Sequence, residues 1–130
     1  MLNDFVHKQE IDILLLQEVT HTDFAMIRGY TAHTNVGTNK RGTAIVTREQ
    51  ITLSNIIKLP SGRGMAASYQ GTWLVNVYAP SGTANRQERE DFYNIELAYL
   101  LRTLSTNMIV GGDFNCVLSQ TDCTGLYELQ

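Results

Sequence analysis

The sequence predicts an α/β sandwich of mixed sheets, and three patterns support that prediction. Residues 11–16 form a nearly continuous apolar run of strand length, which is typical of a strand buried on both faces. Residues 28–78 contain short apolar segments separated by glycine- and proline-containing turns, without a convincing helix. Residues 86–104 carry apolar side chains at the spacing of a helix that packs its leucines on a sheet.

The first half of the chain is expected to be mostly strand. Residues 2–9 resemble the end of a short helix that precedes the apolar run. Antiparallel strands joined by turns are then predicted over residues 29–33, 42–47 and 51–59. Residues 65–69 and 72–78 flank a Gln-Gly turn as a hairpin. In its second arm Trp73 shares one face with two valines, so it is expected in the core rather than as a base-stacking platform.

The helix predicted over residues 86–104 is the strongest local signal. Its apolar positions follow the spacing i, i+4, i+7, i+8 and i+11, at Tyr93, Leu97, Leu100, Leu101 and Leu104. Asn85 followed by Glu88 resembles a capping box, which marks a helix start. A strand is predicted over residues 108–111, directly before the sequence Gly-Asp-Phe-Asn.

Composition limits the class of protein. A chain of 130 residues with 43% apolar and 18% charged residues fits one globular domain that can bury a core. No apolar stretch is long enough for a membrane span and the start lacks a signal-peptide pattern, so an intracellular protein is expected. The histidines show no metal-ligand spacing, and Cys116 and Cys123 are too few for a disulfide framework or a zinc site.

Positive charge is concentrated in one stretch, although the net charge of the chain is −3. Residues 28–63 hold six basic side chains against the single acid Glu49, a net +5 for that segment. Lys40, Arg41 and Arg63 are candidate contacts there to the phosphate backbone of DNA. An ordinary solvated face explains the same pattern, and charge alone favours that explanation.

Three apolar strands end in polar side chains that packing does not require. The sequences are Leu16-Gln17-Glu18, Asn76-Val77-Tyr78-Ala79-Pro80 and Gly112-Asp113-Phe114-Asn115. If these strands lie in one core, their ends can converge on the rim where open α/β sheets place ligands. Each fragment alone is also typical of a solvated turn or a strand end, so only their combination indicates a site.

The residue types at these strand ends suit phosphate chemistry. Glu18 is a hard oxygen ligand for Mg²⁺, which typically takes only about one or two protein carboxylates and keeps waters and phosphate oxygens. Asp113 can orient or deprotonate an attacking water, and Asn115 can donate a hydrogen bond to a phosphate oxygen. The Tyr78 hydroxyl can bind the same phosphate, and the glycines at 111–112 allow close approach of the backbone.

These motifs resemble, in order, three signatures of the endonuclease/exonuclease/phosphatase superfamily, which includes deoxyribonuclease I, exonuclease III and apurinic/apyrimidinic endonucleases. Residues 41–46, 76–82 and 111–118, with Thr121-Asp122 following, further resemble the endonuclease domain of LINE-type non-LTR retrotransposons. In that family the domain nicks target DNA so that the new 3′ end can prime reverse transcription. The resemblance covers essentially the whole chain.

The resemblance implies a fold, a set of site residues and partners. The expected fold is the endonuclease/exonuclease/phosphatase-type α/β sandwich of mixed sheets. Glu18 is expected to ligate the metal, Mg²⁺ or Mn²⁺, and Tyr78 to contact the scissile phosphate. Asp113 with Asn115 is expected to position the nucleophilic water and the transition state. DNA is the implied substrate, a reverse transcriptase domain is expected to follow in the full polypeptide, and a nuclear location is expected.

The sequence departs from the family pattern at both ends. It starts after the family's first strand, which carries a site asparagine, and it contains no Ser-Asp-His motif. Residues 1–130 are therefore expected to be a partial domain, incomplete at both ends. Missing strands would leave sheet edges and apolar faces exposed. The missing Asp-His pair predicts negligible nuclease activity for these residues alone.

Three other functions are compatible with the same residues. An enzyme of the same fold can take a phosphate monoester or a phosphoinositide head group, and a non-catalytic remnant or binding module can retain the motifs without turnover. A doubly wound Mg²⁺- or phosphate-binding signalling domain also places acids at strand ends. That fold requires regular strand-helix alternation, which residues 28–78 do not offer, and the positive segment mildly favours DNA.

Overall fold

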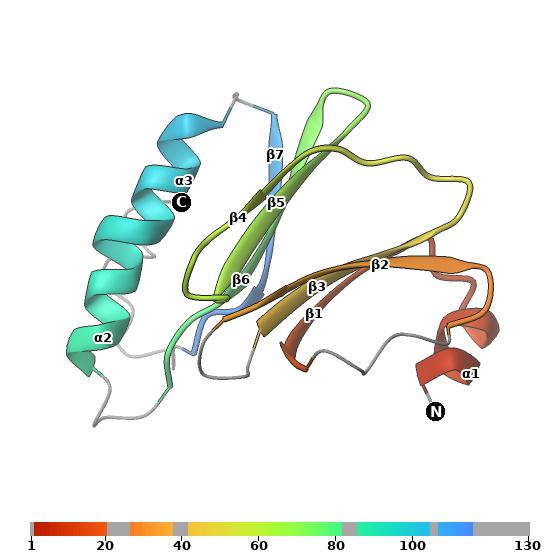
Figure 1. The fold of residues 1–130 in the computed structure, drawn as a ribbon, viewed down its shortest axis with the longest axis horizontal. Coiled ribbons are helices and arrows are strands. Elements are labelled where there is room, and N and C mark those ends of the chain that lie inside the picture. The colour runs from red at the N-terminus through yellow and green to blue at the C-terminus, as the bar shows by residue number, and fades with distance from the viewer. Residues whose placement is uncertain (1, 21–26, 38–41, 82–85, 105–106, 116–130) are drawn as a thin grey trace.

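The structure is a computed structural model that describes residues 2–20, 27–37, 42–81, 86–104 and 107–115 (Figure 1). Within these residues, two sheets pack against each other. A three-stranded antiparallel sheet has the order β1-β3-β2, with β1 at Ile13–Val19, β2 at Tyr30–Val36 and β3 at Gly42–Arg48. A four-stranded mixed sheet has the order β4-β5-β6-β7, with β4 at Ser54–Lys58, β5 at Gly64–Tyr69, β6 at Thr72–Tyr78 and β7 at Met108–Asp113.

Helices cover the outer faces of both sheets (Figure 1). The first, α1 at Leu2–Lys8, buries Val6 against the three-stranded sheet. A continuous helical run lies along the four-stranded sheet and consists of α2 at Arg86–Asp91, a π-helical stretch η2 at Phe92–Leu97, and α3 at Ala98–Thr103. No helix among the described residues is long and apolar enough to cross a membrane. The predicted α/β sandwich of mixed sheets is confirmed.

The strand boundaries follow the predictions with four larger shifts, the first of which is that β2 continues to Val36 rather than ending at residue 33. β1 begins at Ile13 and continues through the Gln-Glu pair to Val19, because β3 pairs with it along this length. β7 continues to Asp113, where it pairs with the end of β6. β4 is shorter than the predicted strand over residues 51–59, because its pairing with β5 begins at Ser54.

β1 is half-buried, whereas the sequence predicts a strand buried on both faces. Leu14 and Leu16 pack against the cluster under α1, and Ile13 and Leu15 pack against a cluster that contains Met65 of β5. Both faces therefore contact core side chains, as the apolar run predicts. Because β1 is an edge strand of its sheet, these side chains keep part of their surface exposed.

The helical run packs its apolar stripe on the four-stranded sheet as predicted. The buried side chains between helix and sheet are Leu59, Ala66, Val75, Val77, Ala79, Phe92, Leu97, Leu100 and Leu104. Trp73 packs at the margin of this cluster, which confirms it as a core residue, and Tyr93 and Leu101 lie there as well. Asn85, the predicted helix cap, lies outside the described residues.

β6 and β7 run parallel and set the geometry of the rim. Their register pairs Tyr78 with Asp113, so the two strands end side by side. Gly112 has a φ of 136°, and a Cβ at this position would lie 2.0 Å from the carbonyl oxygen of Val77. Only glycine permits this approach of the two backbones. The predicted close approach is therefore confirmed at Gly112.

Gly112→Ala is expected to lower the free energy of unfolding by at least about 2 kcal/mol, because the new Cβ meets backbone and the φ disfavours alanine. Gly71→Ala is the matched control, since Gly71 has a φ of 82° but nothing lies within 4 Å of its would-be Cβ. We expect a loss of about 1 kcal/mol for this control. Urea denaturation measures both values, and equal losses would contradict the packing argument.

Candidate active site

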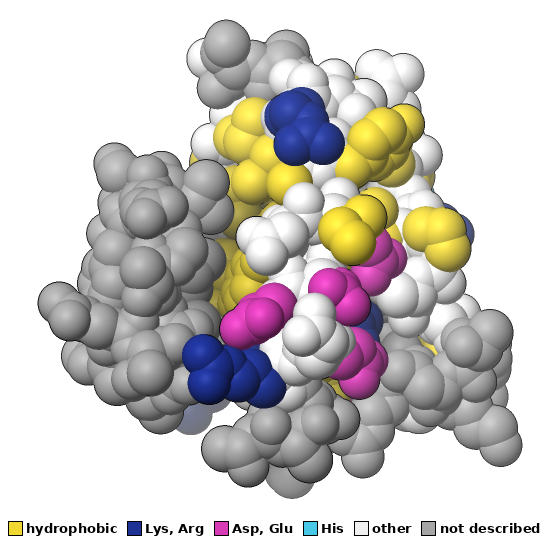
Figure 2. Space-filling view, turned by 90° about the vertical axis from the view of Figure 1, so that its left-hand side faces the viewer, with side chains coloured by type: hydrophobic (Ala, Val, Ile, Leu, Met, Phe, Trp, Pro, Cys, Tyr) yellow, Lys and Arg dark blue, Asp and Glu magenta, His cyan; other side chains and the backbone are white. Residues whose placement is uncertain are grey.

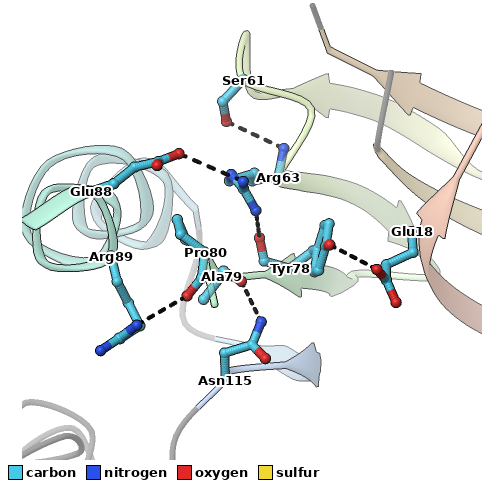
Figure 3. Close-up of polar contacts among 9 residues, drawn as sticks. All are labelled: Glu18, Ser61, Arg63, Tyr78, Ala79, Pro80, Glu88, Arg89 and Asn115. Carbon is cyan, nitrogen blue, oxygen red and sulfur yellow. Dashed lines mark hydrogen bonds and ion pairs between the residues drawn. The ribbon is translucent and has the colours of Figure 1, made fainter. Parts of the chain in front are cut away.

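The polar ends of β1 and β6 meet between the two sheets. The Tyr78 hydroxyl donates a hydrogen bond of 3.2 Å to Oε1 of Glu18, which lies 60 positions earlier in the chain (Figure 3). Tyr78 is buried, whereas Glu18 is exposed. Asp113 pairs with Tyr78 in the parallel ladder, and paired residues of neighbouring strands place their side chains on the same face. The structure therefore brings Glu18, Tyr78 and Asp113 to one rim.

Glu18 is the extra residue of a β-bulge in β1. Gln17 pairs with Thr43 and Val19 pairs with Gly42, so the register with β3 skips Glu18. Its φ of 59° lies in the left-handed region, which costs a non-glycine residue roughly 1–2 kcal/mol. Bulges re-aim side chains, and this one accompanies a carboxylate that faces the Tyr78 hydroxyl.

A tight turn after β7 holds Asp113 and Asn115 together. The Asn115 backbone N–H donates to Oδ1 of Asp113 at 3.0 Å, and Asn115 has a φ of 50°. Asparagine tolerates this conformation and forms such turns readily. Its side-chain amide donates to the Ala79 carbonyl, and the hydroxyl of Tyr93 in η2 donates to the Phe114 carbonyl. The turn is therefore fixed from both the β6 side and the helix side.

The backbone at the end of β6 is held by three side chains from separate parts of the chain (Figure 3). The carbonyls of residues 78, 79 and 80 accept hydrogen bonds from Arg63, Asn115 and Arg89 respectively. These bonds satisfy backbone acceptors where the strand leaves the sheet, and so fix the segment that carries the Tyr78 ring. Arg89 of α2 is buried. Its burial could not be predicted from the sequence, because a charged residue in a helix is expected on the exposed face.

Arg63 lies beside Tyr78, whereas the other predicted phosphate contacts, Lys40 and Arg41, lie outside the described residues. Its Cζ is 5.1 Å from the centroid of the Tyr78 ring, and its Nη2 is 3.5 Å from Oε1 of Glu88. The Arg63 side chain is only 14% exposed. A phosphate that approached this guanidinium would therefore have to compete with the Glu88 carboxylate.

Asn76 is the main residue that the sequence analysis left without a role. Its amide is fully buried and accepts a hydrogen bond of 2.7 Å from the side chain of Gln17, within the Gln-Glu motif. The available signal was a polar residue inside an apolar strand, on the face opposite Val75 and Val77. Its partners could not be found from sequence, because they lie in other strands.

The carboxylates at the rim fit a hard cation such as Mg²⁺ or Mn²⁺ better than a softer metal such as zinc. Glu18 and Asp113 are both exposed, and Mg²⁺ uses about one or two carboxylates with waters and substrate oxygens. Among the residues that the structure describes, no group of three or more His, Cys, Asp or Glu side chains could hold a metal alone. The donor set therefore suits a hard divalent cation that shares its ligands with a phosphate.

The outer face of the helical run carries an excess of acidic side chains over α2, although Arg86 pairs with Glu90 there at 3.2 Å. Glu88, Glu90 and Asp91 are exposed there, and Ile95 and Tyr99 are exposed further along the helical run. Figure 2 shows acidic, basic and hydrophobic side chains together on this face. Carboxylates repel DNA phosphates. A nucleic acid would therefore meet less repulsion at the strand-end rim if it approached from a side other than α2.

Comparison with solved structures agrees with this fold. An AP endonuclease from Archaeoglobus fulgidus shares 18% identity with a TM-score of 0.73, over 92% of this chain and 52% of that chain. The 3′ phosphatase NExo (D146N) from Neisseria, bound to a product DNA hairpin, shares 20% identity with a TM-score of 0.73, over 99% and 57%. TDP2 from D. rerio, complexed with a single-strand DNA product, shares 18% identity with a TM-score of 0.69, over 97% and 56%.

At such identities these likenesses establish the fold alone. The chain spans about half the length of the solved structures it matches. No curated protein matches it. The sequence profile of the Endonuclease/Exonuclease/phosphatase family, however, matches residues 1–129. Because this match covers nearly the full chain and the fold agrees with it, the chain belongs to the endonuclease/exonuclease/phosphatase family.

Proposed function

We propose that residues 1–130 supply the metal- and phosphate-contacting part of a divalent-metal-dependent phosphodiesterase that cuts DNA. The observation that carries this proposal is the hydrogen bond of 3.2 Å between Tyr78 and Glu18, formed beside the strand end that bears Asp113. Two of the similar structures contain product DNA, which supports DNA as the substrate. The motif resemblance supports the finer proposal of a LINE-type retrotransposon endonuclease, nuclear and followed by a reverse transcriptase.

In this proposal each rim residue has a separate task. Glu18 would hold Mg²⁺ or Mn²⁺, which when bound polarises a phosphoryl oxygen of the substrate. The Tyr78 hydroxyl, whose single O–H is donated to Glu18 in this structure, would turn that O–H to the same phosphate group once the cation occupies the Glu18 carboxylate. Asp113 orients the attacking water and accepts its proton. Asn115 already uses one amide N–H on the Ala79 carbonyl, so its second N–H donates to the phosphate. Fixed donors of this kind stabilise the transition state without reorganising.

Basic side chains would position the DNA backbone. Arg63 exchanges its ion pair with Glu88 for a phosphate, and its planar guanidinium suits a phosphate better than an ammonium does. Lys40 and Arg41 belong to the same positive segment and are proposed as further backbone contacts. These contacts carry affinity and register rather than base specificity.

Hydrolysis of a phosphate monoester, such as a phosphoinositide, is a second candidate function. The specific observation in its favour is the likeness to NExo, which is described as a 3′ phosphatase. The same carboxylates and hydroxyl would serve that reaction, since both substrates place charge on non-bridging phosphate oxygens. Side-by-side assays with a DNA duplex and an inositol phosphate separate the two functions.

Glu18→Gln is expected to abolish specific Mn²⁺ binding at the rim, because it removes the charge of the proposed ligand. In a ¹H–¹⁵N spectrum of the wild-type chain, Mn²⁺ should broaden the amide signals around residues 18, 78 and 113 first. Glu49→Gln, an exposed carboxylate in the turn after β3, is the matched control and should leave this broadening unchanged. Broadening that persists in Glu18→Gln would reject Glu18 as the ligand.

The 130-residue chain alone is expected to leave supercoiled plasmid intact in the presence of Mg²⁺, because its sequence has no Ser-Asp-His motif. Gel electrophoresis of the plasmid after incubation measures the nicked fraction. Nicking that disappears in both Glu18→Ala and Asp113→Ala would show instead that the 130-residue chain suffices for turnover and uses these two carboxylates. Nicking that survives both substitutions would indicate a contaminating nuclease.

A further inference from the structure

One buried amide on β6 holds the strand segment that leads into Glu18. Asn76 is 0% exposed, and its Nδ2 donates to the carbonyls of Leu16 at 2.9 Å and Ala44 at 2.8 Å. Its Oδ1 accepts a hydrogen bond of 2.7 Å from Nε2 of Gln17. Both polar atoms of the amide are therefore used, and both connect the four-stranded sheet to the three-stranded sheet. Buried polar groups that are fully satisfied in this way specify one local arrangement.

The contacts of Asn76 reach residues 16 and 17, which directly precede the strained residue Glu18. Glu18 follows Gln17 directly, has a φ of 59°, and is skipped by the β1–β3 register. A non-glycine residue stays in such a conformation only when its surroundings over-determine it. On the later side, Val19 is 3% exposed and pairs with Gly42. On the earlier side, residues 16 and 17 pair with β3, and the two hydrogen bonds of Asn76 add a constraint from the other sheet.

We infer that Asn76 is a positioning residue for the Glu18 carboxylate, acting through the Gln17 side chain and the Leu16 carbonyl. The inference rests on the proposed function, in which Glu18 holds the divalent cation. Because Asn76 is fully buried, it would not contact the cation or the phosphate itself. It fixes the chain direction into the bulge, so that the exposed carboxylate lies within hydrogen-bond distance of the Tyr78 hydroxyl.

If Asn76 only joined the two sheets, its loss would affect stability and not metal binding in particular. A second buried amide in the chain allows these two roles to be distinguished. Asn35 on β2 is also buried, and its Nδ2 donates to the carbonyls of Leu59 and Gly64, both at 2.8 Å. It therefore also bridges the two sheets, but it does not contact the Glu18 segment. If Asn76 only joins the sheets, Asn76→Leu and Asn35→Leu should have equivalent effects on metal binding.

The test compares Asn76→Leu, Asn35→Leu and the wild-type chain in two measurements. Urea denaturation gives the stability of each variant, and Mn²⁺ titration followed by amide broadening at residues 18, 78 and 113 gives its affinity. Asn76→Leu is expected to weaken Mn²⁺ binding by about ten-fold or more, as for other residues that orient a metal ligand. Asn35→Leu should lose a comparable amount of stability while its Mn²⁺ affinity stays within about two-fold of wild type.

A milder variant keeps the inference testable if Asn76→Leu does not fold. Gln17→Met removes the 2.7 Å side-chain bond to Asn76 and a long bond of 3.4 Å to the Leu15 carbonyl, and it leaves both backbone bonds of the Asn76 amide. A loss of Mn²⁺ affinity in this folded variant supports the inference, whereas wild-type affinity in Gln17→Met or in folded Asn76→Leu overturns it. Wild-type chain that binds no Mn²⁺ near Glu18 overturns the inference together with the proposed function. Binding that is present in wild type and unchanged by these variants rejects the inference alone.

Discussion

The parallel pairing of β6 with β7 is the constraint on which the candidate site depends. Gly112 lets the two backbones approach to a distance that any Cβ would obstruct, and the register then ends both strands at the same level. Tyr78 and Asp113 become neighbours as a result. The other sheet adds Glu18 to this rim through its hydrogen bond with the Tyr78 hydroxyl. The segments that carry Glu18, Tyr78 and Asp113 thus meet at one rim, because the two sheets pack against each other and β6 and β7 run parallel.

Backbone strain and buried hydrogen bonds occur together at this rim. Glu18 and Asn115 both have a positive φ, and a side-chain hydrogen bond ties Glu18 to Tyr78 of β6 and Asn115 to Ala79, the residue after β6. Arg63 and Arg89 fix the carbonyls on either side of residue 79. Strained residues persist where packing over-determines them, and pre-organised donors are what phosphate chemistry requires. The local cost at the rim is therefore consistent with a functional role for these side chains.

Much of the fold was predictable because it is encoded locally. The apolar period of residues 86–104 and the hairpin around the Gln-Gly turn both depend on neighbours in sequence, and both were correct. The π-helical stretch of η2 and the bulge at Glu18 were not anticipated, since they arise from pairing with distant partners. The convergence of strand ends could be predicted from their polar residues. The hydrogen bonds of Asn76 to the other sheet could not be predicted, because an isolated polar residue in a strand does not identify its partners.

A Mn²⁺-soaked crystal of the 130-residue chain tests the central claim most directly. The account predicts an anomalous difference peak at the rim, about 2.1 Å from a carboxylate oxygen of Glu18 and on the same side as Asp113 and Tyr78. A Mn²⁺ peak bound elsewhere, or experimental coordinates that place Glu18 and Asp113 on opposite sides of the molecule, would contradict it.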